Sequence, residues 1–222
     1  MASPLATRSA AGHIEAMARK SYHHGNLKSA LVDAVLSLIS EKGPNGFSFA
    51  EAARRAGVSP AAPYRHFKDR DDLIVETARR GYELFAARLE AAWDEGRPSA
   101  LSAFERVGRA YLGFAKAEPA YFAAMFEAGV SPDDDPELRV AADRAFRALE
   151  RACHALAQRM PESQRPPVLM MAYHVWALSH GVTALFGRGD EAQRKAPISA
   201  EELLEAGAAI YLRGVGFLPE DA

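Results

Sequence analysis

Four side chains that can donate hydrogen bonds lie close together in one short stretch: Tyr64, Arg65, His66 and Lys68. Tyr64, His66 and Lys68 can donate to phosphate oxygens, contacts that set the register and affinity of a protein on DNA. Arg65 is the best candidate for reading a guanine, because a guanidinium can donate two hydrogen bonds to that base. These residue types therefore predict recognition of nucleic acid.

The sequence just before these donors predicts two short helices joined by a tight turn. Ser48 can cap the first helix, and Glu51 can reach back to the backbone N–H of the cap. Gly57 suits the left-handed backbone of a sharp helix end. Ser59 is then expected to cap a second helix with Pro60 in its first position, where the missing N–H costs nothing. This layout is a helix-turn-helix, whose second helix is offered to the major groove.

The tip of this expected recognition helix is small and apolar. Pro60, Ala61 and Ala62 donate no intrahelical hydrogen bond, and Pro63 deletes one, so we expect a tight start with a 3₁₀-like turn. Such side chains cannot hydrogen-bond a base edge, although they can contact a thymine methyl group. We therefore expect phosphate contacts to dominate, with Arg65 as the candidate for sequence reading.

Flanking apolar residues predict a small three-helix core around this motif. Helical spacing and bracketing positions assign to it Leu27, Leu31, Val35, Leu38, Ile39, Phe47, Phe49, Val58 and Phe67. Residues 1–20 have no sustained periodicity and are expected to form a flexible arm. Lys20 at its end is a candidate DNA contact, and a frayed basic terminus is the alternative. Asp69 and Asp72 are expected to open the next helix.

Composition favours a cytoplasmic protein that binds DNA at one end. Net charge over the 222 residues is −2, yet the N-terminal third is basic and the remainder acidic. Cys153 is the only cysteine, which fits a reducing compartment. We expect no membrane span and no signal peptide. We also expect no cofactor and no metal site: His23 and His24 are adjacent, and no third ligand is near them.

Residues 71–222 predict a helical body that is rich in aromatic residues and methionine. If this body holds a cavity, the residues expected to line it are Trp93, Tyr111, Phe114, Tyr121, Phe122, Met125, Met170, His174 and Trp176. Each of them alone is more often plain core. For His180, we favour a hydrogen-bonded core histidine over a ligand contact.

Two C-terminal helices are candidates for a homodimer interface. The segment 168–186 is apolar on more than one side, which predicts burial in the core or against a partner. The last helix, expected over about 199–217, carries Ala200, Gly207 and Gly214 seven residues apart. Glycine weakens a helix, so close approach of another helix would explain this stripe. We expect a four-helix interface between two copies, with internal packing as the alternative.

The segments 53–59 (Ala-Arg-Arg-Ala-Gly-Val-Ser) and 64–68 (Tyr-Arg-His-Phe-Lys) resemble the DNA-binding domain of the TetR family of bacterial transcriptional regulators. The segment 176–181, Trp-x-x-x-His-Gly, resembles the signature of one C-terminal subtype of that family. The resemblance implies an all-α homodimer: a three-helix DNA-binding domain over 21–70 and a ligand-binding and dimerisation domain over 71–222. By this analogy Ser48, Tyr64, His66 and Lys68 hold phosphates. Pro63 and the small Ala52 depart from the usual pattern.

The leading interpretation is a repressor that a small apolar or aromatic effector releases from a palindromic DNA operator. The first alternative is a DNA-binding activator or structural protein without an effector. The second is an enzyme, and it has no motif in its favour: the sequence carries no Gly-rich phosphate loop and no nucleophile with a neighbouring base.

Overall fold

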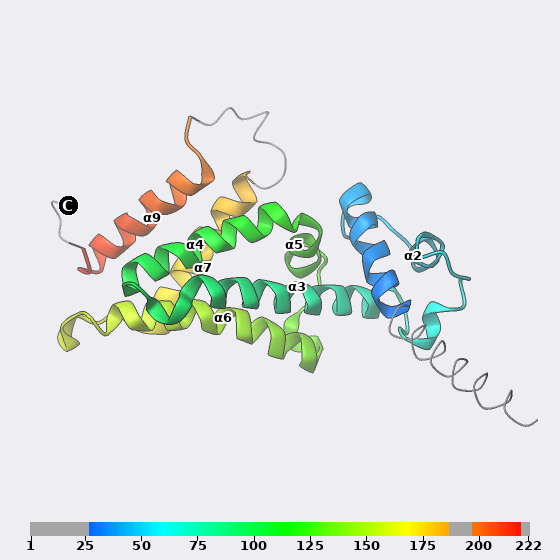
Figure 1. Cartoon of the computed structure of the whole chain (residues 1–222), viewed down its shortest axis with the longest axis horizontal. Coiled ribbons are helices and arrows are strands. Elements are labelled where there is room, and N and C mark those ends of the chain that lie inside the picture. Colours follow the sequence, from blue (N-terminus) through cyan, green and yellow to red (C-terminus); the bar gives the residue numbers. More distant parts are fainter. Residues whose placement is uncertain (1–26, 187–196, 219–222) are drawn as a thin grey trace, which may run out of the picture. The chain divides into compact units, whose positions relative to one another are not determined.

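The computed structural model describes residues 27–186 and 197–218, which are helical and contain no strand (Figure 1). The prediction of an all-α fold is thus confirmed. Backbone contacts divide the chain into two compact units, Met1–Thr77 and Ala78–Ala222. The arm, including Lys20, and the pair His23 and His24 lie outside the described residues.

The first unit packs short helices around one apolar core. A helix covers residues 27–42, α2 spans Phe49–Arg55, a 3₁₀ helix (η1) spans Pro63–Arg65, and α3 (Arg70–Trp93) begins in this unit. Its buried residues include Leu31, Val35, Leu38, Phe47, Phe67, Leu73 and Ile74. The predicted capping box is confirmed: Glu51 N–H donates to Ser48 Oγ at 3.2 Å, and Ser48 N–H donates to Glu51 Oε2 at 2.9 Å. Gly57 has the expected positive φ, +72°.

The recognition segment differs from the prediction. Ser59 does not cap an α-helix that begins at Pro60; the only helical turn is η1, which starts after Ala62 and has no side-chain cap. The Ser59 carbonyl accepts from the N–H of Ala62 at 3.0 Å, three residues ahead. An α-helix would need an N–H at position 63, and proline has none. The segment is therefore held by 3₁₀ hydrogen bonds, whereas the sequence predicts such a turn only at the start of an α-helix.

Two aspartates organise the start of α3. Asp69 Oδ1 accepts from the N–H of Asp72, and Asp72 Oδ2 accepts from the N–H of Lys68, each at 2.9 Å. Carboxylates are favourable there because the first N–H groups of a helix lack intrahelical partners. The expectation that Asp69 and Asp72 open this helix is confirmed.

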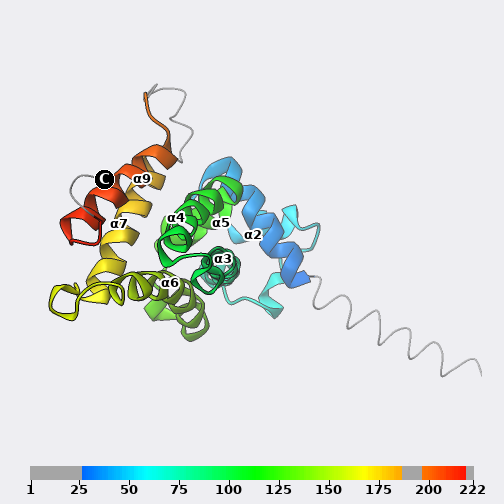
Figure 2. The same ribbon diagram turned by 60° about the vertical axis from the view of Figure 1, so that its left-hand side comes forward.

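The second unit is a bundle of longer helices (Figures 1 and 2). Its elements are the rest of α3, η2 (Asp94–Gly96), α4 (Ala100–Ala117), α5 (Pro119–Phe126), η3 (Pro132–Asp134), α6 (Pro136–Ala157), η4 (Glu162–Gln164), α7 (Val168–Phe186) and α9 (Ala200–Gly214). Helix α4 is central and packs against α5, α6, α7 and α9. Helix α7 in turn contacts α6 and α9. Prolines at the first positions of α5 and α6 explain the sharp breaks before those helices.

Helix α7 is only partly buried within one chain. Met171, Ala172, Val175 and Val182 face the core, whereas Leu169, Met170, Tyr173 and Leu185 are each about half exposed. Among the described helices, α7 alone is long and apolar enough to cross a membrane by length and composition, a test that core helices also pass. Its packing against α4, α6 and α9 accounts for one side, and its outer side is left uncovered.

The glycine stripe of the last helix has a different explanation from the one expected. A Cβ at Gly207 would lie 2.9 Å from Leu178 of α7, so this glycine lets α9 approach a helix of its own chain. A Cβ at Gly214 would meet no atom within 4 Å. The part of the prediction that assigned Gly207 to another copy is therefore wrong, because α7 already occupies that space.

Candidate functional site

Apart from Lys20, the residues predicted to meet DNA belong to the first unit and mostly face solvent. Tyr64 is 64% exposed. The other exposed members are Ser48, Ser59, Pro60, Ala61, Arg65 and Lys68, while Ala62 and His66 are half-buried. Pro63 is buried, so its ring fills the core and does not point outward. Tyr64 and Arg65 are thus consecutive exposed residues of η1, and the exposed Lys68 follows three positions later.

Two side-chain contacts hold this surface in shape. The ring of Tyr64 packs edge-on against Phe49 of α2, with 5.0 Å between centroids. Arg70 Nε donates to the carbonyl of Phe47 at 3.0 Å, its guanidinium also donates to the carbonyl of Pro44, and it lies 4.8 Å from the Phe47 ring centroid. Arg70 therefore ties the start of α3 to the loop that carries Ser48. No sequence motif predicts this contact, which joins residues 23 positions apart.

Ion pairs within the unit neutralise some of the basic side chains that the sequence indicates as possible DNA contacts. Arg55 donates to both carboxylate oxygens of Glu41, at 2.6 and 2.7 Å, and Lys42 Nζ lies 2.7 Å from Glu51 Oε1. The hydrogen bond from Lys42, with those from Ser48, lowers the pKa of Glu51 to about 2. In the part of the chain that the structure describes, Arg65 and Lys68 have no ion-pair partner, so they remain available for phosphate or base contacts.

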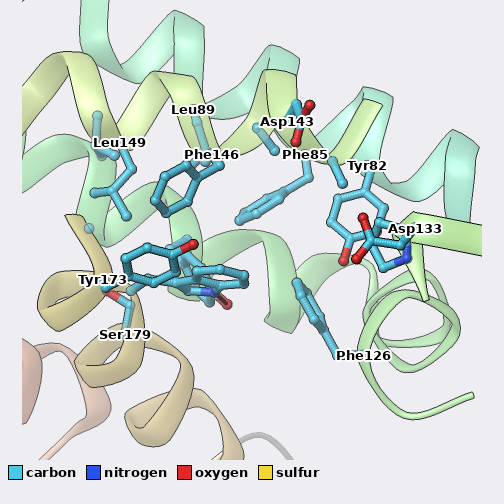
Figure 3. Close-up of a pocket in the computed structure, with 17 residues that line it drawn as sticks. Tyr82, Phe85, Leu89, Phe126, Asp133, Asp143, Phe146, Leu149, Tyr173 and Ser179 are labelled. Atoms are coloured by element: carbon cyan, nitrogen blue, oxygen red, sulfur yellow. Dashed lines mark hydrogen bonds between the residues drawn. The ribbon is translucent and has the colours of Figure 1, made fainter. Parts of the chain in front are cut away.

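The second unit contains a cavity of about 300 Å³ among α3, α4, α6 and α7 (Figure 3). This volume is at the lower end of the range typical of small-molecule sites, about 300–1,000 Å³. The residues that line it are Tyr82, Phe85, Leu89, Val107, Gly108, Tyr111, Phe126, Pro132, Asp133, Ala142, Asp143, Ala145, Phe146, Leu149, Tyr173, Trp176 and Ser179. Two of the predicted lining residues, Tyr111 and Trp176, are among them.

A chain of hydrogen bonds joins one wall of the cavity to the Trp-x-x-x-His-Gly segment. Trp176 Nε1–H donates to the Tyr111 hydroxyl at 3.2 Å, and that hydroxyl lies 3.0 Å from His180 Nδ1. Four residues separate Trp176 from His180, so both project from one face of α7 and bracket the same oxygen. His180 also stacks on Phe122, with 5.6 Å between centroids. His180 is therefore hydrogen-bonded inside the bundle, as expected.

Burial shifts the pKa of both partners in this network. It raises the pKa of the Tyr111 hydroxyl, so the phenol keeps its proton. It lowers the pKa of His180, and the carboxylate of Glu127 opposes this effect weakly. A neutral imidazole can accept the Tyr111 proton at Nδ1 while Tyr111 accepts from Trp176.

The other predicted lining residues lie elsewhere in the second unit. Phe114, Phe122 and Met125 are buried in the core and are not among the lining residues. Tyr121 packs beside Gly81, and Trp93 borders a separate, open groove with Arg147 and Arg151. Met170 and His174 are exposed on α7; His174 Nδ1 lies 3.2 Å from the Tyr211 hydroxyl.

Several lining residues escaped the sequence-based prediction, notably Tyr82, Phe85, Phe146, Tyr173 and Asp143. Their helical spacing indicates a buried face, but it does not distinguish a residue that fills the core from one that borders a void. Among the described residues, no three His, Cys, Asp or Glu side chains form a group that could hold a metal ion.

Both units match known families. Residues 31–77 match the family described as "Bacterial regulatory proteins, tetR family", and residues 104–210 match "Tetracyclin repressor-like, C-terminal domain". Together the matches span more than half of the chain. The chain belongs to the TetR family.

Individual proteins resemble the chain in sequence or in fold. A curated protein of Haemophilus influenzae, an uncharacterized HTH-type transcriptional regulator, is 32% identical over 73 residues, which cover 33% of this chain and 39% of that protein. This chain thus covers well under half of that relative. A solved protein of unknown function from Rhodococcus sp. RHA1 is 28% identical with a TM-score of 0.70, over 87% of this chain and 97% of that one. The TetR regulator PfmR of Thermus thermophilus has a similar fold, with a TM-score of 0.64 and 21% identity over 82% and 97% of the two chains.

Proposed function

We propose that this TetR-family protein is a transcriptional repressor, and that a small molecule bound in the second unit releases it from an operator. The observation that carries the proposal is the pairing of a solvent-facing helix-turn-helix, with Arg65 and Lys68 unpaired, and an aromatic cavity in the same chain. Residues 21–70 would bind DNA, residues 71–222 would bind the effector and a second copy, and the arm over 1–20 would add contacts. The protein would act in the cytoplasm and catalyse no reaction.

The uncovered faces of α7 and α9 support a homodimer. Leu169, Met170, Tyr173 and Leu185 on α7 and Ile210 on α9 are large apolar side chains left at least half exposed. Large apolar side chains exposed on neighbouring helices are typical of an interface. A twofold dimer would present two recognition segments to successive major grooves, about 34 Å apart on a palindromic site.

The C-terminal unit would belong to the subtype with the Trp-x-x-x-His-Gly signature. Support comes from the geometry of Trp176 and His180, which both bond to Tyr111 and so connect the signature to a cavity wall. A ligand that displaces Tyr111 would then displace Trp176 and His180 and so shift α7, which also carries part of the expected dimer interface. This arrangement supplies a physical route from effector to dimer geometry.

Binding of the purified full-length protein to its own upstream DNA tests the proposal. Affinity should fall with salt along a straight line in log–log form, since phosphate contacts release counter-ions. A flat salt dependence would sink the DNA-binding role. An activator without an effector remains the second candidate; it predicts tight DNA binding that no compound weakens and no compound that raises the melting temperature.

Ser48 offers a sharper test, because it has both a structural and an expected DNA contact. Aspartate caps a helix about as well as serine, but its carboxylate would lie beside that of Glu51, whose Oε2 is 3.2 Å from Ser48 Oγ, so Ser48→Asp should also lower the free energy of unfolding. Its negative charge would face phosphate, and we expect DNA affinity to fall at least about tenfold at moderate salt. Ser48→Ala is the control for lost stability without added charge: it should cost about 1 kcal/mol and weaken DNA binding much less than Ser48→Asp. Urea unfolding and fluorescence anisotropy measure the two effects; unchanged DNA affinity in Ser48→Asp would remove Ser48 from the interface.

A further inference from the structure

The lining of the cavity carries acidic groups and no basic group. Asp133 and Asp143 are among the lining residues, and Lys, Arg and His are absent from that set. Asp133 forms an ion pair with Arg139, whose guanidinium lies 3.2 Å away. Both side chains are well exposed, and such a pair is weak. No ion pair involves Asp143 within the described chain. A carboxylate ligand would therefore meet like charge, whereas a cation would meet opposite charge.

Aromatic rings form much of the remaining wall. Figure 3 draws Tyr82, Phe126 and Asp133 at one end of the cavity and Leu149, Tyr173 and Ser179 at the other. Tyr82 and Phe126 meet edge to face, with 5.6 Å between centroids. The face of an aromatic ring attracts an ammonium group within about 6 Å. Rings and carboxylate at this end thus favour the same kind of ligand group.

Two hydroxyl groups on the wall belong to residues that are buried as a whole. The Tyr82 side chain belongs to a residue that is 7% exposed, and Ser179 is 1% exposed. Neither hydroxyl has a hydrogen-bond partner within the residues that the structure describes. Both residues line the cavity, so a polar atom of a bound ligand can supply the partner that each hydroxyl lacks. Burial raises the pKa of Tyr82 to about 12, which keeps its hydroxyl protonated and uncharged.

We propose that the effector is an organic ammonium ion: a protonated amine, carried on an aromatic or apolar body, that binds beside Asp133 and Tyr82. Asp143 adds a second negative charge along the wall, and the body lies against the ring cluster of Phe146, Tyr173 and Trp176, with Ser179 at its far end. This inference rests on the proposed function for its regulatory meaning, but binding can be measured without DNA.

A matched series of ligands tests the sign of the charge. Phenylbutylamine, phenylbutanol and phenylbutyrate share one body and end in a cation, a neutral hydroxyl and an anion. By calorimetry with the full-length protein, we expect the amine to bind about tenfold tighter than the alcohol and the carboxylate to bind weakest. Equal or tighter binding of phenylbutyrate, or no binding of any of the three, would overturn the inference.

Substitutions assign the effect to particular groups. Asp133→Asn and Asp143→Asn should each reduce the preference for amine over alcohol about threefold, since both carboxylates are partly solvated. Asp134→Asn is the matched control, because Asp134 lies in the same 3₁₀ turn as Asp133 but does not line the cavity. Arg139→Gln should strengthen amine binding by releasing Asp133. An unchanged preference in both lining variants would contradict the assignment.

The inference and the proposed function fail in different ways. If phenylbutyrate binds and weakens DNA binding, the repressor stands and the ammonium inference falls. If the amine binds with the expected preference while the protein shows no salt-dependent DNA binding, the inference stands and the repressor falls. Fluorescence anisotropy on the upstream DNA, run with and without each compound, separates these results.

Discussion

Replacing Tyr111 with phenylalanine is expected to lower the free energy of unfolding by about 1–2 kcal/mol, measured by urea denaturation, because Trp176 and His180 are half-buried and lose one partner each. The hydroxyl accepts from Trp176 Nε1 and lies 3.0 Å from His180 Nδ1, so its loss removes the partner of both groups. A buried polar group left unpaired costs about 1–3 kcal/mol. The ring itself is kept, so packing against Phe85 is retained.

The matched control is Tyr173→Phe, which removes the same atom from the same cavity. Tyr173 is about half exposed, and its hydroxyl has no hydrogen-bond partner among the described residues. We expect a change below about 0.5 kcal/mol there. If the two variants lose equal stability, the bonds of Tyr111 to Trp176 and His180 contribute nothing. The double variant Tyr111→Phe with Trp176→Phe should cost less than the sum of its parts, because the orphaned indole N–H is gone.

The same network predicts a dependence of stability on pH. The folded pKa of His180 is below its ordinary value of 6.5, so the unfolded chain takes up a proton more readily than the folded one. The stability from this group is complete above pH 6.5 and is lost as the pH falls through 6.5 toward the folded pKa. His180→Asn should flatten the melting temperature over this range. An equally steep decline in the variant would mean that another group is responsible.

Lys68→Ala is expected to weaken DNA binding about 100-fold at fixed salt, whatever the DNA sequence. A dimer would lose two charge-assisted hydrogen bonds to phosphate, each worth about 1.5 kcal/mol. The slope of log affinity against log salt should also become shallower by about 2, since two fewer counter-ions are released. Lys68 is exposed and unpaired among the described residues, so its loss should leave stability unchanged.

Arg65→Ala is the informative partner of this variant. If Arg65 reads a guanine, its removal should weaken the operator by about 1–3 kcal/mol per base contact and leave non-specific DNA nearly unaffected. The ratio of the two affinities is therefore the quantity to measure, by anisotropy on operator and scrambled duplexes. A uniform loss over both would make Arg65 another phosphate contact. Tyr64→Phe should behave like Lys68→Ala, with a smaller effect.

The sequence by itself determined the features that depend on neighbours along the chain. The capping box at Ser48, the turn at Gly57, the Asp69 start of α3 and the all-α fold follow from spacing and from local backbone chemistry. The start of the recognition segment is an exception. Ser59 was expected to cap an α-helix although Pro63 stands where the first bond back to Ser59 would form, and the structure has a 3₁₀ turn instead.

Tertiary structure decided which buried residues border a void and which fill the core. Phe114 and Tyr111 lie on the same helix with the same apolar spacing, yet only Tyr111 lines the cavity, whereas Phe114 is fully buried and packs against Phe85. Tyr82 of α3 and Asp143 of α6 are far apart in the sequence, and only the packing of the helices makes both line one cavity. Likewise, the sequence predicts close approach of another helix at Gly207, but only the packing shows that this helix is α7 of the same chain. Periodicity determines the buried face of a helix; what that face meets depends on how the helices pack.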